Sequence, residues 1–135
     1  MQYEDRVRPE WIDNNDHMNL AYYVLVFEGA IGAMAERLGL AGGVRMTQMH
    51  TVYEREVMRG DRLRVETHLL AADATRLHLF QELFHAETGY RSATLETLAE
   101  HDAPFTAEAA RSITALIAAS PPEGAGRRIA MARRR

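Results

Sequence analysis

The chain contains no cysteine and no lysine among its 135 residues. The absence of cysteine excludes disulfide bonds, thiolate metal sites and a cysteine nucleophile. The absence of lysine excludes a lysine Schiff base and a P-loop lysine, and all sixteen basic residues are arginine. No apolar run approaches the ~20 residues of a membrane-spanning helix, and the first ten residues hold no apolar signal-peptide core. We therefore expect a cytoplasmic protein without membrane contact.

The residues that are present fit a single globular domain, because 47% of them are hydrophobic and 26% are charged. The charge is unevenly distributed. Residues 120–135 carry five Arg and one Glu, a net charge of +4, whereas the whole chain carries −3 and the remainder therefore −7. An acidic body does not suit a nucleic-acid-binding protein. We expect one folded domain over residues 1–119 and a flexible basic tail over residues 120–135.

The hydrophobic pattern changes along the chain and predicts an α+β fold. Weak alternation over residues 3–10 predicts a first strand, and residues 20–38 predict a helix whose first two turns are apolar on every side. The period then becomes two, and residues 106–120 return to helical spacing. The four later strands are predicted at residues 48–57, 62–70, 76–86 and 91–101.

These elements predict one antiparallel sheet crossed by one long helix. Short turns between the four later strands predict a meander in which each strand pairs with the next. A helix that is apolar on all sides needs more cover than one sheet gives. We therefore expect a second subunit to complete that cover.

A polar loop stands directly before the apolar helix. Residues 13–19 hold five acid or amide side chains and one histidine, and residues 20–27 hold no charge. One interpretation is structural, because Asn and Asp commonly form turns and cap helices, here at Asp16 or Asn19. The other is chemical. A helix N-terminus offers N–H donors that polarise a carbonyl, and Asp13 would place a carboxylate beside them.

The segment WIDNNDHMNLAYYVLVFE resembles the signature of the hotdog-fold acyl-CoA thioesterases of the 4-hydroxybenzoyl-CoA thioesterase type, in which a D-x-x-G-H-[VM]-N loop precedes a hydrophobic helix. The resemblance extends over roughly residues 5–102. It implies a hotdog fold, in which an antiparallel five-stranded sheet wraps around one long central helix, with a C-terminal helix added. It also implies an acyl-CoA substrate and a homodimer or homotetramer with active sites between subunits.

The resemblance assigns the catalytic carboxylate to Asp13 and the polarising N–H to the helix start, near Asn19 or Leu20. His17 and Asn19 match family residues that shape the loop and contact the thioester or a water. One position departs from the pattern, because Asp16 stands where the family has Gly. If the backbone there needs positive φ, Asp tolerates it better than most residues.

The motif D-x-N-x-H-M-N-x-A-Y-Y, together with RLHLF, is most similar to thioesterases of carnitine breakdown, including domains fused to carnitine dehydrogenase. That branch implies betainyl-CoA, whose trimethylammonium group aromatic faces would hold. An equally simple interpretation places the aromatic residues of this chain in the core. The candidate contacts to the acyl group are Trp11, Asn15, Tyr22, Tyr23, Phe27, Glu28 and Tyr53.

For the CoA phosphates, arginine is the expected partner. Arg59 and Arg62 near the turn at residues 59–61 are the first candidates, with Arg64, Arg76 and Arg91 as further ones, although a solvated strand face explains them equally well. We expect no metal and no cofactor other than the coenzyme A of the substrate. The other five histidines lack a ligand spacing; they are His50, His68, His78, His85 and His101.

Two other functions remain open from the sequence. A hotdog enoyl-CoA hydratase would use Asp13 and His17 together, although the loop is one residue shorter than its pattern and lacks the proline. A non-catalytic acyl-CoA-binding protein is the other, and Asp16 at the usual Gly position favours it. Release of free thiol separates the thioesterase from both.

Overall fold

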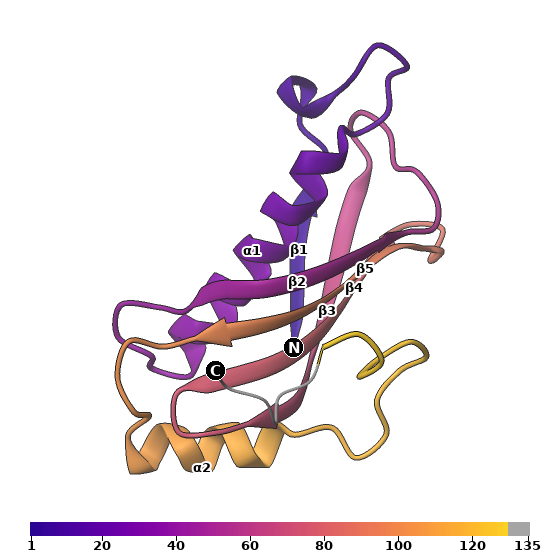
Figure 1. Cartoon of the computed structure of the whole chain (residues 1–135). Coiled ribbons are helices and arrows are strands. Elements are labelled where there is room, and N and C mark those ends of the chain that lie inside the picture. The colour runs from indigo at the N-terminus through magenta and orange to yellow at the C-terminus, as the bar shows by residue number, and fades with distance from the viewer. Residues whose placement is uncertain (130–135) are drawn as a thin grey trace.

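The computed structural model of the chain describes residues 1–129 and has the expected α+β architecture, with five antiparallel strands and two α-helices (Figure 1). A short 3-10 turn, Pro9–Trp11, precedes the polar loop. The elements are β1 (Gln2–Arg6), α1 (Leu20–Arg37), β2 (Arg45–Tyr53), β3 (Arg62–Ala72), β4 (Arg76–His85), β5 (Arg91–Glu100) and α2 (Ala107–Leu116). No helix within this part of the chain is long and apolar enough to cross a membrane.

Helix α1 begins where the sequence predicts. The side chain of Asn19 caps it by accepting a hydrogen bond from the N–H of Ala21 at 3.0 Å. Its buried side packs against the sheet, with Phe27 fully inaccessible to solvent. Gly29 allows β1 to approach, because a Cβ there would lie 2.8 Å from the hydroxyl of Tyr3. Helix α1 is therefore held tightly against β1.

The side of α1 that faces away from the sheet is apolar in its first turns and is not covered by residues 1–129. Leu20 and Leu25 are 58% and 47% exposed. Strand β2 adds further exposed apolar side chains, those of Met49, Val52 and Tyr53. This exposure agrees with the expectation that one sheet is not enough to cover α1.

The order of strands in the sheet is β1-β3-β4-β5-β2, and every neighbouring pair is antiparallel. The predicted meander is therefore wrong for β2, which pairs with β5 at one edge instead of with β3. The connection over residues 54–61 is long enough to carry the chain across the end of the sheet. There, Gly60 and Asp61 exchange backbone hydrogen bonds with Val7, which follows β1.

Element boundaries differ modestly from the predicted ones. Strand β2 occupies Arg45–Tyr53 instead of residues 48–57, and α2 ends at Leu116 instead of residue 120. Strand β3 is confirmed in detail, because Leu63, Val65, Thr67 and Leu69 are all buried and share one face.

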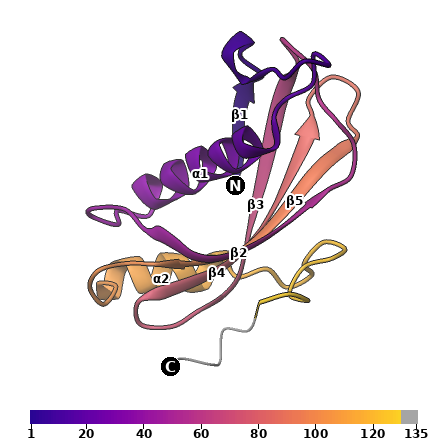
Figure 2. The ribbon, with the colours of Figure 1, turned by 45° about the horizontal axis from the view of Figure 1, so that its top comes forward.

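Strands β4 and β5 are buried on both faces, because the sheet is covered from two sides (Figure 2). Helix α1 covers one face, where Gln81 Nε2 donates to the carbonyl of Phe27 at 3.2 Å. Helix α2 and the segment after it cover the other, which we call the outer face. Of the tail predicted over residues 120–135, residues 130–135 lie outside the described residues. Residues 123–129 contact the outer face.

Candidate active site

The carboxylate of Asp13 holds the polar loop in shape. Its Oδ1 accepts hydrogen bonds from the N–H of Asn15 at 2.9 Å and of His17 at 3.2 Å. The N–H of Asp13 itself donates to the carbonyl of His17 at 2.9 Å. Asp13 therefore does stabilise the turn, as the structural interpretation of the loop expects. Within residues 1–129 its Oδ2 has no hydrogen-bond partner, so the same side chain keeps one oxygen available.

Asp16 adopts the backbone conformation that glycine would adopt. Its φ is +62°, and it is the one non-glycine residue of the described chain with positive φ. Arg59 Nε lies 3.1 Å from Asp16 Oδ1 and ties this position to the segment before β3. The expectation that Asp16 tolerates a positive φ at the usual Gly position is therefore met.

The first turn of α1 leaves one backbone donor unused. The N–H of Asn19 donates to the carbonyl of Trp11 at 2.8 Å, and the N–H groups of Ala21 and Tyr22 both donate to Asn19. The N–H of Leu20 has no acceptor in the described part of the chain. Of the two positions expected for a polarising donor, the geometry leaves Leu20.

The segment that connects β2 to β3 lies against the polar loop. The N–H of Met18 donates to the carbonyl of Val57 at 3.0 Å, and His17 and Met58 form an isolated antiparallel bridge. His17 Nδ1 lies 3.0 Å from Glu56 Oε2. Glu56 was not predicted from the sequence, because only the long-range pairing of these two segments brings it to His17.

The candidate aromatic residues form two separate pairs instead of one cage. Trp11 stacks on Tyr22 with ring centroids 5.5 Å apart, and Tyr23 meets Tyr53 edge-on at 5.1 Å. Phe27 belongs to the core. Burial raises the pKa of Tyr23 and of Tyr53, so both phenols stay protonated near neutral pH.

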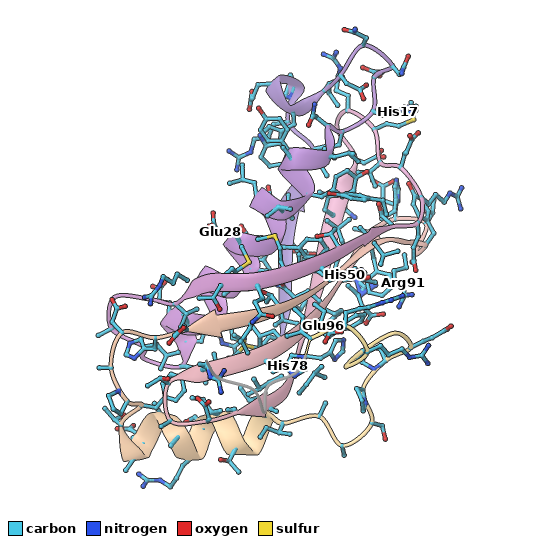
Figure 3. The ribbon with its side chains drawn as sticks, viewed as in Figure 1. His17, Glu28, His50, His78, Arg91 and Glu96 are labelled. Carbon is cyan, nitrogen blue, oxygen red and sulfur yellow. The ribbon has the colours of Figure 1, made fainter. Side chains whose placement is uncertain are left out.

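Tyr53 also supports the start of α1, because its hydroxyl donates to the carbonyl of Leu20 at 3.2 Å. Glu28 is exposed on α1 (Figure 3) and lies two turns beyond the polar loop. Asn15 is exposed in that loop.

All candidate arginines lie beside carboxylates. Arg59 is the one that reaches the polar loop, through Asp16, while Arg62 Nε lies 3.6 Å from Glu87. Both are more than half exposed, and such surface pairs contribute little stability and exchange readily for another anion. The others are paired as Arg64 with Glu66, Arg76 with Asp73, and Arg91 with Glu54 and Glu82.

A second cluster of ionisable groups lies on the outer face, away from His17 (Figure 3). Glu96 is 1% exposed, and its Oε2 lies 2.8 Å from His78 Nε2. The backbone N–H groups of Arg127, Arg128 and Ile129 also donate to this carboxylate, at 3.2, 3.3 and 2.9 Å. Residues 127–129 therefore hold Glu96 in a ring of donors.

The neighbouring ion pairs on the outer face are equally complete. Burial acts to raise the pKa of Glu82, but hydrogen bonds from His68 and Arg91 outweigh it and hold that pKa below its usual range. Hydrogen bonds to Glu54 raise the pKa of Arg91. A cavity of about 110 Å³ lies beside these groups. Of the charged side chains that line it, Glu54 pairs with Arg91 and Glu96 pairs with His78.

Within residues 1–129, no group of three or more His, Asp or Glu side chains is arranged to hold a metal ion. The chemistry available at the polar loop is thus that of a carboxylate, an imidazole and a backbone N–H. Such a set can polarise a carbonyl and deliver a nucleophile to it.

Comparison with known proteins identifies the family of this chain. A family model described as the thioesterase-like superfamily matches residues 7–101. A betainyl-CoA thioesterase of Pseudomonas aeruginosa is 34% identical over 148 aligned residues, which cover 96% of this chain and 93% of that protein. The resemblance expected from the sequence, including its branch, is confirmed.

Solved structures show the same fold. A crystal structure of a candidate thioesterase from Pseudomonas putida superposes with a TM-score of 0.85 at 29% identity, covering 96% of this chain and 94% of that one. A Staphylococcus aureus protein solved in complex with CoA gives a TM-score of 0.74 at 28% identity, with the same coverage of both chains. Residues 7–101, which the family model matches, include both the polar loop and α1.

Proposed function

Because the chain belongs to the thioesterase-like superfamily, we propose that it hydrolyses acyl-CoA thioesters at the N-terminus of α1. One observation carries this proposal. The available Oδ2 of Asp13 and the available N–H of Leu20 belong to one short loop and helix start, whose backbone is fixed by Trp11, Val57 and Asn19. A carboxylate and an oxyanion donor held in one rigid element are the two groups that thioester hydrolysis needs.

In this mechanism the thioester oxygen accepts the hydrogen bond of the Leu20 N–H, at the positive end of the α1 dipole. Asp13 Oδ2 either attacks the carbonyl carbon or removes a proton from an attacking water. The C–S bond breaks, and its electron pair leaves with the CoA thiolate. Both routes consume one water and release a carboxylic acid and CoA.

The acyl group that we propose is betainyl. The Pseudomonas aeruginosa relative supports this choice by its name. In this chain Tyr22 lies in the first turn of α1 and is partly exposed, with its ring stacked on buried Trp11, and aromatic faces attract a trimethylammonium group. Tyr53 is the second aromatic side chain near Leu20 and has an exposed surface. Exposed Arg59 and Arg62 are the proposed contacts to the CoA phosphates.

We further propose that the active enzyme is a homo-oligomer. Strand β2 pairs with β5 on one side and leaves its other edge unpaired within residues 1–129, and that edge carries exposed Met49, Val52 and Tyr53. The exposed apolar side of α1 lies at the same end of the molecule as the polar loop. A second subunit at these surfaces would exclude water from the site. The cytoplasmic location stays a prediction.

The test is thiol release from a panel of acyl-CoA esters that includes betainyl-CoA, measured with a thiol-reactive dye. Asp13→Asn keeps the oxygen that shapes the loop and removes the nucleophile, so we expect release to be lost while the fold is retained. Asp102→Asn is the matched control, because Asp102 is an exposed carboxylate that pairs with Arg45 at the far end of the sheet.

Absence of release from every ester, by a protein that binds those esters, would contradict the proposal. It would leave the hydratase or a non-catalytic binding protein. Consumption of an enoyl-CoA without thiol release would identify the hydratase.

A further inference from the structure

Glu56 occupies a position for which neither the loop motif nor the proposed mechanism accounts. It lies in the connection between β2 and β3, and its carboxylate reaches the ring of His17, with 3.0 Å between Glu56 Oε2 and His17 Nδ1. His17 Nε2 has no partner among residues 1–129. A carboxylate this close to one ring nitrogen favours the proton on that nitrogen, and the other nitrogen then keeps its lone pair available.

The backbone around Glu56 is fixed from three directions. The hydroxyl of Tyr90 donates to the carbonyl of Glu56 at 2.6 Å, and the N–H of Val57 donates to the hydroxyl of Tyr23 at 3.3 Å. The carbonyl of Val57 accepts from Met18, the neighbour of His17. The two segments are therefore locked in register.

The residue before Glu56 is fixed as well. Ser92 Oγ donates to the carbonyl of Arg55 at 2.5 Å, and the guanidinium of Arg55 lies 4.0 Å from the ring centre of Tyr90. Although 66% of the Glu56 side chain is exposed, its starting point is thus rigid. The backbone therefore does not have to be ordered when the carboxylate holds the imidazole, and only the side-chain torsions of Glu56 become fixed.

We propose that Glu56 is a positioning residue that holds neutral His17 with its proton on Nδ1, so that Nε2 accepts the proton of the water that attacks the acyl carbon. The inference rests on the proposed thioester hydrolysis. In this step the water oxygen bonds to the acyl carbon, one water proton moves to Nε2, and the leaving group departs with its electron pair. That leaving group is the Asp13 carboxylate, because the step follows the route in which Asp13 attacks the thioester first.

The first readout is independent of activity. Imidazole ¹⁵N shifts of the folded protein report which ring nitrogen carries the proton. We expect His17 to be mainly the Nδ1–H form in the wild type and to change to mainly the Nε2–H form in Glu56→Ala. Glu56→Gln retains an acceptor oxygen, so we expect it to lie between the two. A wild type in which Nε2 carries the proton would overturn the inference, whether or not the protein is a thioesterase.

The second readout is kinetic. We expect Glu56→Ala to lower kcat by about tenfold with KM within about twofold, because the residue acts on the proton transfer and not on binding. Glu56→Gln should lose less. Glu36→Gln, on an exposed carboxylate at the far end of α1, should match the wild type. Unfolding midpoints of all variants separate this effect from a loss of folding.

A double-mutant cycle completes the test. If Glu56 acts through His17, Glu56→Ala should cost nothing further in a His17→Ala background. An equal loss in both backgrounds would overturn the inference while leaving the thioesterase proposal in place. Absence of thiol release by the wild type would instead contradict the proposed function itself.

Discussion

Two of the histidine–carboxylate pairs in residues 1–129, one at the polar loop and one on the outer face, differ in how many of their polar atoms are left without a partner. At the polar loop, the side chains of His17 and Glu56 are 30% and 66% exposed. On the outer face, the side chains of His78 and Glu96 are 8% and 1% exposed. The first pair therefore lies at the surface beside a helix N-terminus, and the second lies deep under the segment that ends at Ile129.

Burial explains why the two pairs must differ. A buried carboxylate is costly unless every oxygen is matched by a donor, and Glu96 meets that condition with His78 and three backbone N–H groups. A site for a substrate must keep donors and acceptors unused. The polar loop does so at Asp13 Oδ2, His17 Nε2 and the Leu20 N–H. A buried ion pair whose donors and acceptors all have partners thus indicates a structural role. Donors and acceptors that lack partners at a rigid helix start indicate a catalytic role.

The largest expected effect comes from breaking the buried pair. Glu96→Ala leaves His78 and the N–H groups of residues 127–129 without their acceptor, so we expect the free energy of unfolding to fall by about 3 kcal/mol. Urea unfolding at neutral pH measures this. Glu36→Ala, on an exposed carboxylate, is the control and should change it by less than about 0.5 kcal/mol. A loss below about 1 kcal/mol for Glu96→Ala would refute the structural role.

The next effect concerns the apolar surface beside the polar loop. The substitution Leu25→Arg should raise the Kd of self-association about 100-fold, because the new charge would be buried between subunits without a partner. Analytical ultracentrifugation over a range of protein concentrations measures it. The matched control is Leu116→Arg, since Leu116 is similarly exposed but lies on α2 at the outer face. Equal behaviour of the two variants would place the subunit contact elsewhere.

A smaller effect is the pH dependence of stability that comes from Glu82 in the outer-face ion pairs. The folded-state pKa of Glu82 lies below its ordinary value of 4.5, because hydrogen bonds from His68 and Arg91 outweigh burial. Its stabilising contribution is therefore fully present above the unfolded-state pKa and is lost as the pH falls through the folded-state pKa. We expect Glu82→Gln to flatten the acid side of a plot of unfolding free energy against pH. An unchanged acid slope would argue against the pairing.

The smallest effect concerns the backbone at Asp16. Because φ there is +62°, Asp16→Ala should cost about 1 kcal/mol of stability, whereas Asp16→Gly should be nearly neutral despite the loss of the contact to Arg59. Thermal unfolding of both variants compares them directly. If Ala were tolerated as well as Gly, the positive φ would not constrain this position.

Local patterns predicted the elements, while long-range pairing decided where they meet. The alternation of β3 and the uncharged start of α1 are visible in neighbouring residues, so both were predicted correctly. The position of β2 beside β5 was not, because strand pairing depends on the path of residues 54–61 and not on the period of β2 itself. The same path brings Glu56 to His17, which is why that contact could not be predicted.

The candidate site shows the same division. Asp13, His17, Asn19 and Leu20 lie in one continuous segment, so a local motif is enough to predict that they lie together. The aromatic candidates were grouped by residue type, but adjacent positions on a helix point in different directions. Tyr22 therefore stacks on Trp11, while Tyr23 turns inward to meet Tyr53.

The most direct test of the contrast between the two regions is to measure thiol release and unfolding free energy together for Asp13→Asn and Glu96→Gln. We predict that Asp13→Asn lowers kcat by about 1,000-fold with stability nearly unchanged. We predict that Glu96→Gln lowers stability and leaves kcat of the folded protein nearly unchanged. Full thiol release by Asp13→Asn would contradict the account, because the polar loop would then be only the turn before a helix.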